Sequence, residues 1–135
     1  MKQNKPIITP FLIVQNATKA LDFYKAAFGA EVLYKNDMSD GKVTSKIGIE
    51  GAELFVGDEE PEFANFSPTT IGGSAVRIIL TVDNPDAVFT RAVETGATQI
   101  CPVRTEESWR IGKLKDPFGH IWEIGRPLDG DAGPN

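Results

Sequence analysis

The sequence predicts an α+β fold in which two βαβββ modules set their four-stranded sheets together as a cup, with the helices outside. The pattern strand, capped helix, glycine, strand occurs twice, once in FLIVQNATKALDFYKAAFGAEV and again in VRIILTVDNPDAVFTRAVETGATQI. Gly29-Ala30 and Gly96-Ala97 hold equivalent places in the two stretches, about half a chain apart. Internal repetition of this kind predicts architecture more strongly than any local pattern.

The composition is that of one globular domain and excludes several classes of protein. The chain has 135 residues, of which 41% are hydrophobic and 24% charged. Its formal charge of −5 and the lack of a basic run argue against a nucleic-acid partner. No apolar run reaches the ~18 residues that a membrane span needs. A lone cysteine, Cys101, builds no disulfide framework, so we expect a cytoplasmic protein.

The repeat divides the chain into one domain, residues 1–128, followed by a tail. Module one covers about 7–58, a linking loop covers 57–74, and module two covers about 75–126. The tail, 129–135, is rich in Gly, Pro and Asp and is expected to be disordered. The linking loop is predicted to be irregular and exposed. It is long enough to be a lid, a dimer contact through Phe63 and Phe66, or a plain linker.

The first module begins with the apolar run 7–14, which Pro10 interrupts, so an edge or bulged strand is predicted. Asn16 or Thr18 caps the helix that follows, and Gly29 ends it. An apolar stripe at helical spacing runs along this helix, formed by Leu21, Tyr24 and Phe28. The segments EVLYKN, TSKIGI and AELFVG are the three strands after it.

The second module repeats this order. The strand in VRIILTV leads to a helix that Asn84 or Asp86 caps, with Pro85 in the first turn, where its missing N–H costs nothing. Gly96 then precedes the strand ATQI. The segments WRIGKLKD and HIWEIG are the last two strands.

Several short motifs occur in an order and spacing that resemble a known family. They are Thr9-Pro10-Phe11, Asp22 to Tyr24 with Phe28 to Glu31, Gly72 to Ser74, Gly96-Ala97, Trp109, and Asp116 to His120. Over residues 7–126 the chain resembles the glyoxalase/bleomycin-resistance/extradiol-dioxygenase group, the vicinal oxygen chelate (VOC) superfamily, and within it the PhnB-like branch. The resemblance implies two βαβββ modules and a homodimer. It leaves the chemistry open, because this fold hosts isomerases, dioxygenases, thiol transferases and drug-binding proteins.

Metal-using members of that superfamily place their ligands on the first and fourth strands of each half. The matching positions here are Thr9, a place near Glu53, Arg77 and Glu123. A guanidinium keeps its proton and cannot bind a cation. Two like charges ~4 Å apart cost ~4 kcal/mol at an effective dielectric constant near 20. We therefore expect Arg77 to take the place of the metal and pair with Glu123, with no metal cofactor.

The only histidine, His120, follows the segment DPFG, which suits a type I turn. Strand residues alternate between faces, so if Glu123 points into the cup, His120 and Trp122 point out. We expect His120 to be bonded to nearby backbone, with metal ligation as the less favoured alternative. Glu123 is an ion-pair partner, a carboxylate that contacts substrate, or a metal ligand. Arg77 is its partner or an ordinary solvated residue of the strand.

Alternation from Thr9, Glu53 and Arg77 also predicts which other side chains line the cup. They are Phe11, Ile13, Phe55, Ile79 and Thr81. By its resemblance to PhnB-like proteins, Trp109 is a pocket aromatic, and Arg110 follows it. Aromatic side chains can stack on a planar ligand, and Arg77 or Arg110 can hold an anion. Alternatively, the aromatic residues simply fill the cup as core.

Three hypotheses about function follow. The leading one is a metal-free protein that binds a compact, partly aromatic or anionic small molecule. Its ligand-binding residues would be Thr9, Phe11, Phe55, Arg77, Trp109, Arg110 and Glu123. The second is a lyase, isomerase or dioxygenase that uses a divalent metal at Glu53 and Glu123. The third is a metal-free enzyme with Glu123 as its catalytic general base, a role that a paired cation opposes.

Overall fold

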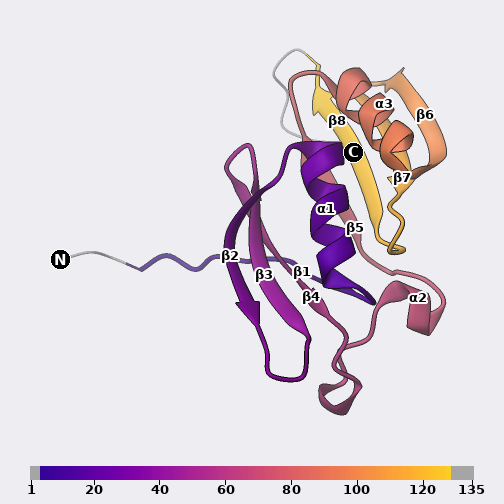
Figure 1. The fold of residues 1–135 in the computed structure, drawn as a ribbon. Coiled ribbons are helices and arrows are strands. Elements are labelled where there is room, and N and C mark those ends of the chain that lie inside the picture. Colours follow the sequence, from indigo (N-terminus) through magenta and orange to yellow (C-terminus); the bar gives the residue numbers. More distant parts are fainter. Residues whose placement is uncertain (1–3, 129–135) are drawn as a thin grey trace.

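The computed structural model describes residues 4–128. It confirms the α+β fold, with two four-stranded sheets that each carry a helix (Figure 1). The first module comprises β1 (Phe11–Val14), α1 (Ala17–Phe28), β2 (Glu31–Asp37), β3 (Val43–Ile49) and β4 (Ala52–Asp58). The second comprises β5 (Arg77–Thr81), α3 (Pro85–Thr95), β6 (Thr98–Glu106), β7 (Trp109–Lys115) and β8 (Ile121–Pro127). The tail 129–135, for which the sequence predicts disorder, lies outside the described residues.

The two sheets share one topology. Their strand orders are β1-β4-β3-β2 and β5-β8-β7-β6. In each sheet the first strand pairs in parallel with the last strand of its module, and the other pairs are antiparallel. Both sheets are therefore mixed, and the repeat in the sequence is a repeat of structure.

The two helices begin in the same way. The Asn16 side chain accepts a hydrogen bond from the Lys19 backbone N–H at 3.1 Å, and the Asn84 side chain accepts one from Ala87 at 3.2 Å. These bonds satisfy N–H groups that the first turn of a helix leaves free. Asparagine is thus the cap in both modules, and the alternatives Thr18 and Asp86 lie inside the helices.

Each sheet has one face covered by helices and one open face. The covered faces bury mainly aliphatic side chains, among them Leu12, Val14, Ile47, Leu54, Val56, Leu80, Leu114 and Ile124. Helix α1 also packs on the second module, where Tyr24 and Phe28 contact the Trp122 ring at 5.7 and 4.7 Å between centroids. The two modules therefore share one core through α1.

A buried carboxylate joins the modules at this contact. Asp116, in the turn before β8, accepts hydrogen bonds from the Tyr24 hydroxyl of α1 and from Trp122 Nε1 at 2.9 Å. Its other oxygen accepts the backbone N–H groups of Phe118 and His120 at 2.9 and 3.0 Å. Burial raises the pKa of Tyr24 well above its usual range, and the nearby Asp116 carboxylate adds to the rise.

Two segments differ from the sequence prediction. Strand β1 starts only after Pro10, and residues 4–10 form an N-terminal arm outside any regular element that leads away from the body of the protein (Figure 1). The linking loop holds two short helices, Pro61–Phe63 and α2 (Pro68–Ile71), rather than irregular chain only. Ser67 caps α2 and Pro68 occupies its first position, so the Ser-Pro pair was the signal that the prediction missed.

Among residues 4–128, no helix is long and apolar enough to cross a membrane.

Candidate functional site

The open face of the first sheet carries a small aromatic cluster. Phe11 of β1 and Phe55 of β4 are partners in the strand register, and their rings stack with centroids 5.6 Å apart at 17°. Lys46, which lies opposite Phe55 on β3, holds its ammonium 5.4 Å from the centre of that ring. The same ammonium is 2.9 Å from Glu53 Oε1. The face thus offers a flat apolar surface beside a neutralised charge pair.

The open face of the second sheet carries a charged cluster around Glu123. The Arg77 guanidinium lies 3.5 Å from Glu123 Oε2, and the Lys113 ammonium lies 3.7 Å from the same oxygen. The Glu123 side chain is 15% exposed, whereas that of Arg77 is 59% exposed. The cluster therefore has one carboxylate, two cations and a net positive charge. The predicted Arg77–Glu123 pair is present, and Arg77 keeps a solvent-facing side.

The other predicted ligand residues lie apart from these two clusters. Arg110 points to the helix-covered side, where it grips the Asp86 carboxylate of α3 through Nε and Nη2 at 2.7 and 2.6 Å. This pairing lowers the pKa of Asp86 and raises that of Arg110. Trp109 is only 6% exposed, and its indole N–H meets no acceptor among residues 4–128. Thr9 belongs to the N-terminal arm and is partly exposed.

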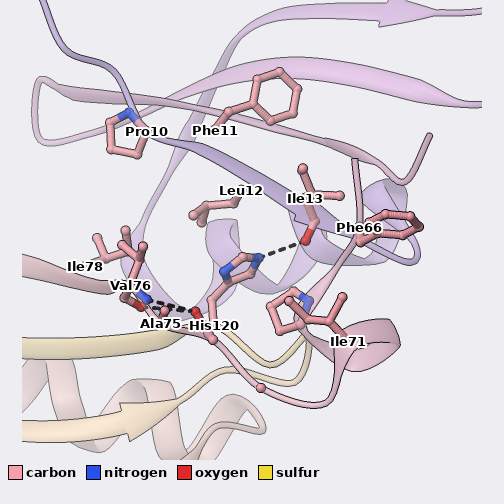
Figure 2. A pocket seen from close by; sticks show the side chains of 13 residues that line it. Pro10, Phe11, Leu12, Ile13, Phe66, Ile71, Ala75, Val76, Ile78 and His120 are labelled. Carbon is pink, nitrogen blue, oxygen red and sulfur yellow. Dashed lines mark hydrogen bonds between the residues drawn. The ribbon is translucent and has the colours of Figure 1, made fainter. Parts of the chain in front are cut away.

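His120 sits at the junction of the two modules. Its Nε2 is 2.9 Å from the carbonyl oxygen of Ile13, so its partner is backbone, as predicted, although that backbone belongs to the other module. Figure 2 shows the imidazole inside a pocket of about 260 Å³ between β1, α2 and the start of β5. The pocket is otherwise mostly apolar, with Phe11, Ile13, Phe66, Ile71, Val76 and Ile78 among its lining residues.

The residues at the positions matched to a metal do not form a metal site. Within residues 4–128, no three His, Cys, Asp or Glu side chains gather in a way that could hold an ion. Glu53 and Glu123 lie on different sheets, and each is paired with a lysine. Arg77, a permanent cation, occupies a third position that the resemblance matches to a metal ligand. The donor set present here therefore does not fit a divalent metal.

The structure brings the predicted residues together in two groups. Phe11 and Phe55 form one, and Arg77 and Glu123 form the other, each on the open face of its own sheet. In the described part of the chain, no ion pair, hydrogen bond or ring contact joins the two groups. The sequence analysis missed Lys46 and Lys113. Lys113 lies an even number of residues from Trp109 on β7, so the same period-two argument would have found it. No residue of β3 was predicted to face the cup, so the sequence analysis had no reference position from which to find Lys46.

The fold and the open faces define the class of protein, a pair of βαβββ modules that presents polar and aromatic groups on uncovered sheets. Sequence comparison gives the family: the chain matches the Glyoxalase/Bleomycin resistance protein/Dioxygenase superfamily over residues 7–124 and belongs to it. An uncharacterized protein of Mycobacterium bovis is 37% identical over 130 residues, covering 92% of this chain and 85% of its own length.

Two solved structures show the same fold at low sequence identity. TioX from Micromonospora sp. ML1 matches with a TM-score of 0.71 and 22% identity, over 92% of this chain and all of that one. The fosfomycin resistance protein FosX from Listeria monocytogenes, solved with Mn(II) and sulfate, has a TM-score of 0.70 and 15% identity, over 94% and 96% of the two chains. At these identities the likeness concerns the fold alone.

Proposed function

We propose that this protein binds a small, flat, anionic molecule without a metal ion, in the manner of a sequestering or carrier protein. The observation that carries the proposal is the charge arrangement around Glu123. Two cations flank this carboxylate, at a position that the resemblance matches to a metal ligand of metal-using members of the superfamily. The cluster has the charge to attract an anion and lacks the ligands to hold a cation.

The two open faces would bind different parts of the ligand. The stacked Phe11 and Phe55 rings supply apolar surface for a planar group. Among residues 4–128 Arg77 pairs only with Glu123, and it is more than half exposed, so its remaining donors are available to a carboxylate or phosphonate. Glu123 holds Arg77 and Lys113 in place, and it gives the binding site a preference for ligands with donors of their own.

A metal-dependent lyase, isomerase or dioxygenase is the alternative that the fold family offers, since FosX carries Mn(II) in its structure. It would need Glu53 and Glu123 to leave their lysine partners and meet across two sheets. Elemental analysis of protein purified without chelator tests this alternative directly. We expect substoichiometric zinc, nickel, manganese and iron, and a full equivalent of any of them would overturn the proposal.

Isothermal titration calorimetry tests ligand binding, with phenylphosphonate as a flat anion and benzyl alcohol as its uncharged counterpart. Arg77→Met should raise the Kd of phenylphosphonate about tenfold, the change expected when a charge-assisted hydrogen bond worth about 1.4 kcal/mol is lost. The Kd of benzyl alcohol should change little. Arg104→Met is the matched control, because Arg104 is equally exposed at 61% and also paired with a glutamate. Equal effects of the two substitutions would show that Arg77 has no special role.

The finer family placement belongs to the same proposal. The motifs at Trp109 and at Asp116 to His120 support the PhnB-like branch of the superfamily. The half-buried free thiol of Cys101 supports a reducing compartment such as the cytoplasm.

A further inference from the structure

The pocket at the junction of the two modules contains one imidazole, that of the chain's only histidine. His120 Nε2 lies 2.9 Å from the carbonyl oxygen of Ile13, which can only accept a hydrogen bond, so Nε2 carries the proton. In the neutral ring the other nitrogen, Nδ1, is then an acceptor. Figure 2 shows Nδ1 on the side of the ring that faces away from Ile13, toward Val76 and Ile78. No donor among residues 4–128 bonds to it.

The rest of the pocket wall leaves no other polar side chain for a ligand. Ser74 is the one further lining residue with a polar side chain. Its hydroxyl is already engaged with the backbone of Val76, since it donates to the carbonyl oxygen at 3.1 Å and accepts from the N–H at 3.4 Å. The wall is therefore apolar except for one acceptor, Nδ1 of His120.

This distribution of polar groups selects the kind of molecule that fits the pocket. An ordered water needs two to four polar partners, and among the lining side chains only His120 supplies one. A mostly apolar molecule with a single hydroxyl group covers the apolar walls and gives Nδ1 the donor that it lacks. Replacing loosely held water with such a molecule is favourable.

The size and the aromatic walls of the pocket favour one aromatic ring. The volume of about 260 Å³ lies below the range of about 300–1,000 Å³ that is usual for drug-sized ligands. Phe11 and Phe66 both line the pocket and are 48% and 41% exposed, so each has ring surface left to cover. A ring placed beside them buries apolar area and makes aromatic contacts.

The part of the wall that α2 supplies is held in place on both sides. The Ser67 N–H donates to Glu59 Oε1 at 2.8 Å, and Gln15 Nε2 donates to Thr70 Oγ1 at 3.1 Å. On the other side, Pro68 packs on the turn before β8, where a Cβ added at Gly119 would lie 2.7 Å from it. The pocket is therefore formed before a ligand arrives, and binding does not have to order it.

We propose that this pocket binds a small phenol, a single aromatic ring whose hydroxyl donates a hydrogen bond to Nδ1 of His120. The inference does not rest on the proposed function, because neither Arg77 nor Glu123 lines this pocket and the ligand is uncharged. Phe11 belongs to the wall and also stacks on Phe55, so the pocket adjoins the aromatic cluster of the first open face. A bound ring would contact both modules.

The test compares phenol with toluene, the same ring without a donor, in NMR titrations of the full chain. Saturating phenol should shift the Hε1 resonance of His120, which is unambiguous in a chain with one histidine. His120→Phe keeps a ring but has no acceptor, so the Kd of phenol should rise about tenfold while that of toluene changes little. An unmoved Hε1 resonance, or equal effects of the substitution on both compounds, would overturn the inference.

A second variant tests the location and leaves the imidazole intact. Val76 lines the pocket and is 64% exposed, so Val76→Trp should be tolerated and fill the space. Phenol should then no longer shift the Hε1 resonance of His120. Ile100→Trp is the matched control, because Ile100 is also exposed but lies on β6, outside the pocket, and this variant should keep the shift. Phenol binding to Val76→Trp as tight as to the wild type would refute the site.

A third measurement separates this inference from the proposed function. Arg77→Met, which should weaken phenylphosphonate, should leave the Kd of phenol unchanged, because Arg77 does not line the pocket. A protein that binds phenol at His120 but not phenylphosphonate would refute the proposed function alone. The reverse result would refute the phenol site alone.

Discussion

Replacing Asp116 with asparagine tests the contact that joins the two modules. The carboxylate lies in the core at the turn before β8 and accepts four hydrogen bonds, two at each oxygen. Asparagine is nearly isosteric but has only one acceptor oxygen, and its amide nitrogen carries two hydrogens. One pair of donors must therefore face an N–H group instead of an oxygen.

The cost follows from which pair loses its acceptor. If the amide nitrogen faces Phe118 and His120, two backbone N–H groups are left unpaired. If it faces Tyr24 and Trp122, the tyrosine hydroxyl can turn and accept, so only the indole N–H is unpaired. The second arrangement is cheaper. It leaves one buried donor unsatisfied, at about 1–3 kcal/mol, and weakens the remaining bonds because the charge is gone. We expect a loss of about 3 kcal/mol, or about 10 °C in Tm for a chain of this size.

Urea unfolding followed by tryptophan fluorescence and circular dichroism measures this loss, and the two probes must coincide for a single free energy to apply. Asp22→Asn is the control, since Asp22 is an exposed aspartate on α1. In NMR spectra, the chemical shift of the Trp122 indole N–H should also change in Asp116→Asn and stay the same in the control. A stability within about 0.5 kcal/mol of the control would refute the hydrogen-bond account, because that is the range of surface substitutions.

Three further outcomes are expected. Because the pKa of Tyr24 is raised on folding, stability should be complete below the ordinary tyrosine value of about 10 and fall as pH rises beyond it, and Tyr24→Phe should flatten that alkaline fall in pH-dependent urea unfolding. The Ser67 backbone N–H lowers the pKa of Glu59, so its stabilising effect should be complete above the ordinary glutamate value of about 4.3 and be lost as pH falls below it, and Glu59→Gln should lose less stability in acid than the wild type. Gly125→Ala should cost about 1–3 kcal/mol or prevent folding, because the new Cβ would lie 2.5 Å from the Arg110 carbonyl, whereas Gly73→Ala meets open space and should change the melting temperature little.

The sequence predicted the fold because the signals that define it are local and occur twice. Asparagine caps, the glycines that end the helices and period-two strands each act within a few residues, and together they determine both modules. The same periodicity placed Trp122 and Glu123 on opposite faces of their strand, and in the structure Trp122 is buried whereas Glu123 contacts Arg77 and Lys113.

The candidate site was less predictable, because its contacts join residues far apart in the chain. Whether Arg110 faces the ligand or Asp86 depends on the register of β7 against α3, which no short motif encodes. The same holds for the His120 contact with Ile13, which crosses from one module to the other. The start of β1 was misjudged because Pro10 was treated as an interruption rather than as the boundary of the strand.

The two modules differ most on the open faces of their sheets. Their helix-covered faces both bury aliphatic residues, as the packing of a helix on a sheet demands. Their open faces have no such obligation, yet one carries stacked phenylalanines and the other a carboxylate between two cations. A ligand that fits both must have a flat apolar part and a charged part. Such a ligand also requires the two faces to meet, whereas among residues 4–128 no ion pair or ring contact joins the two clusters.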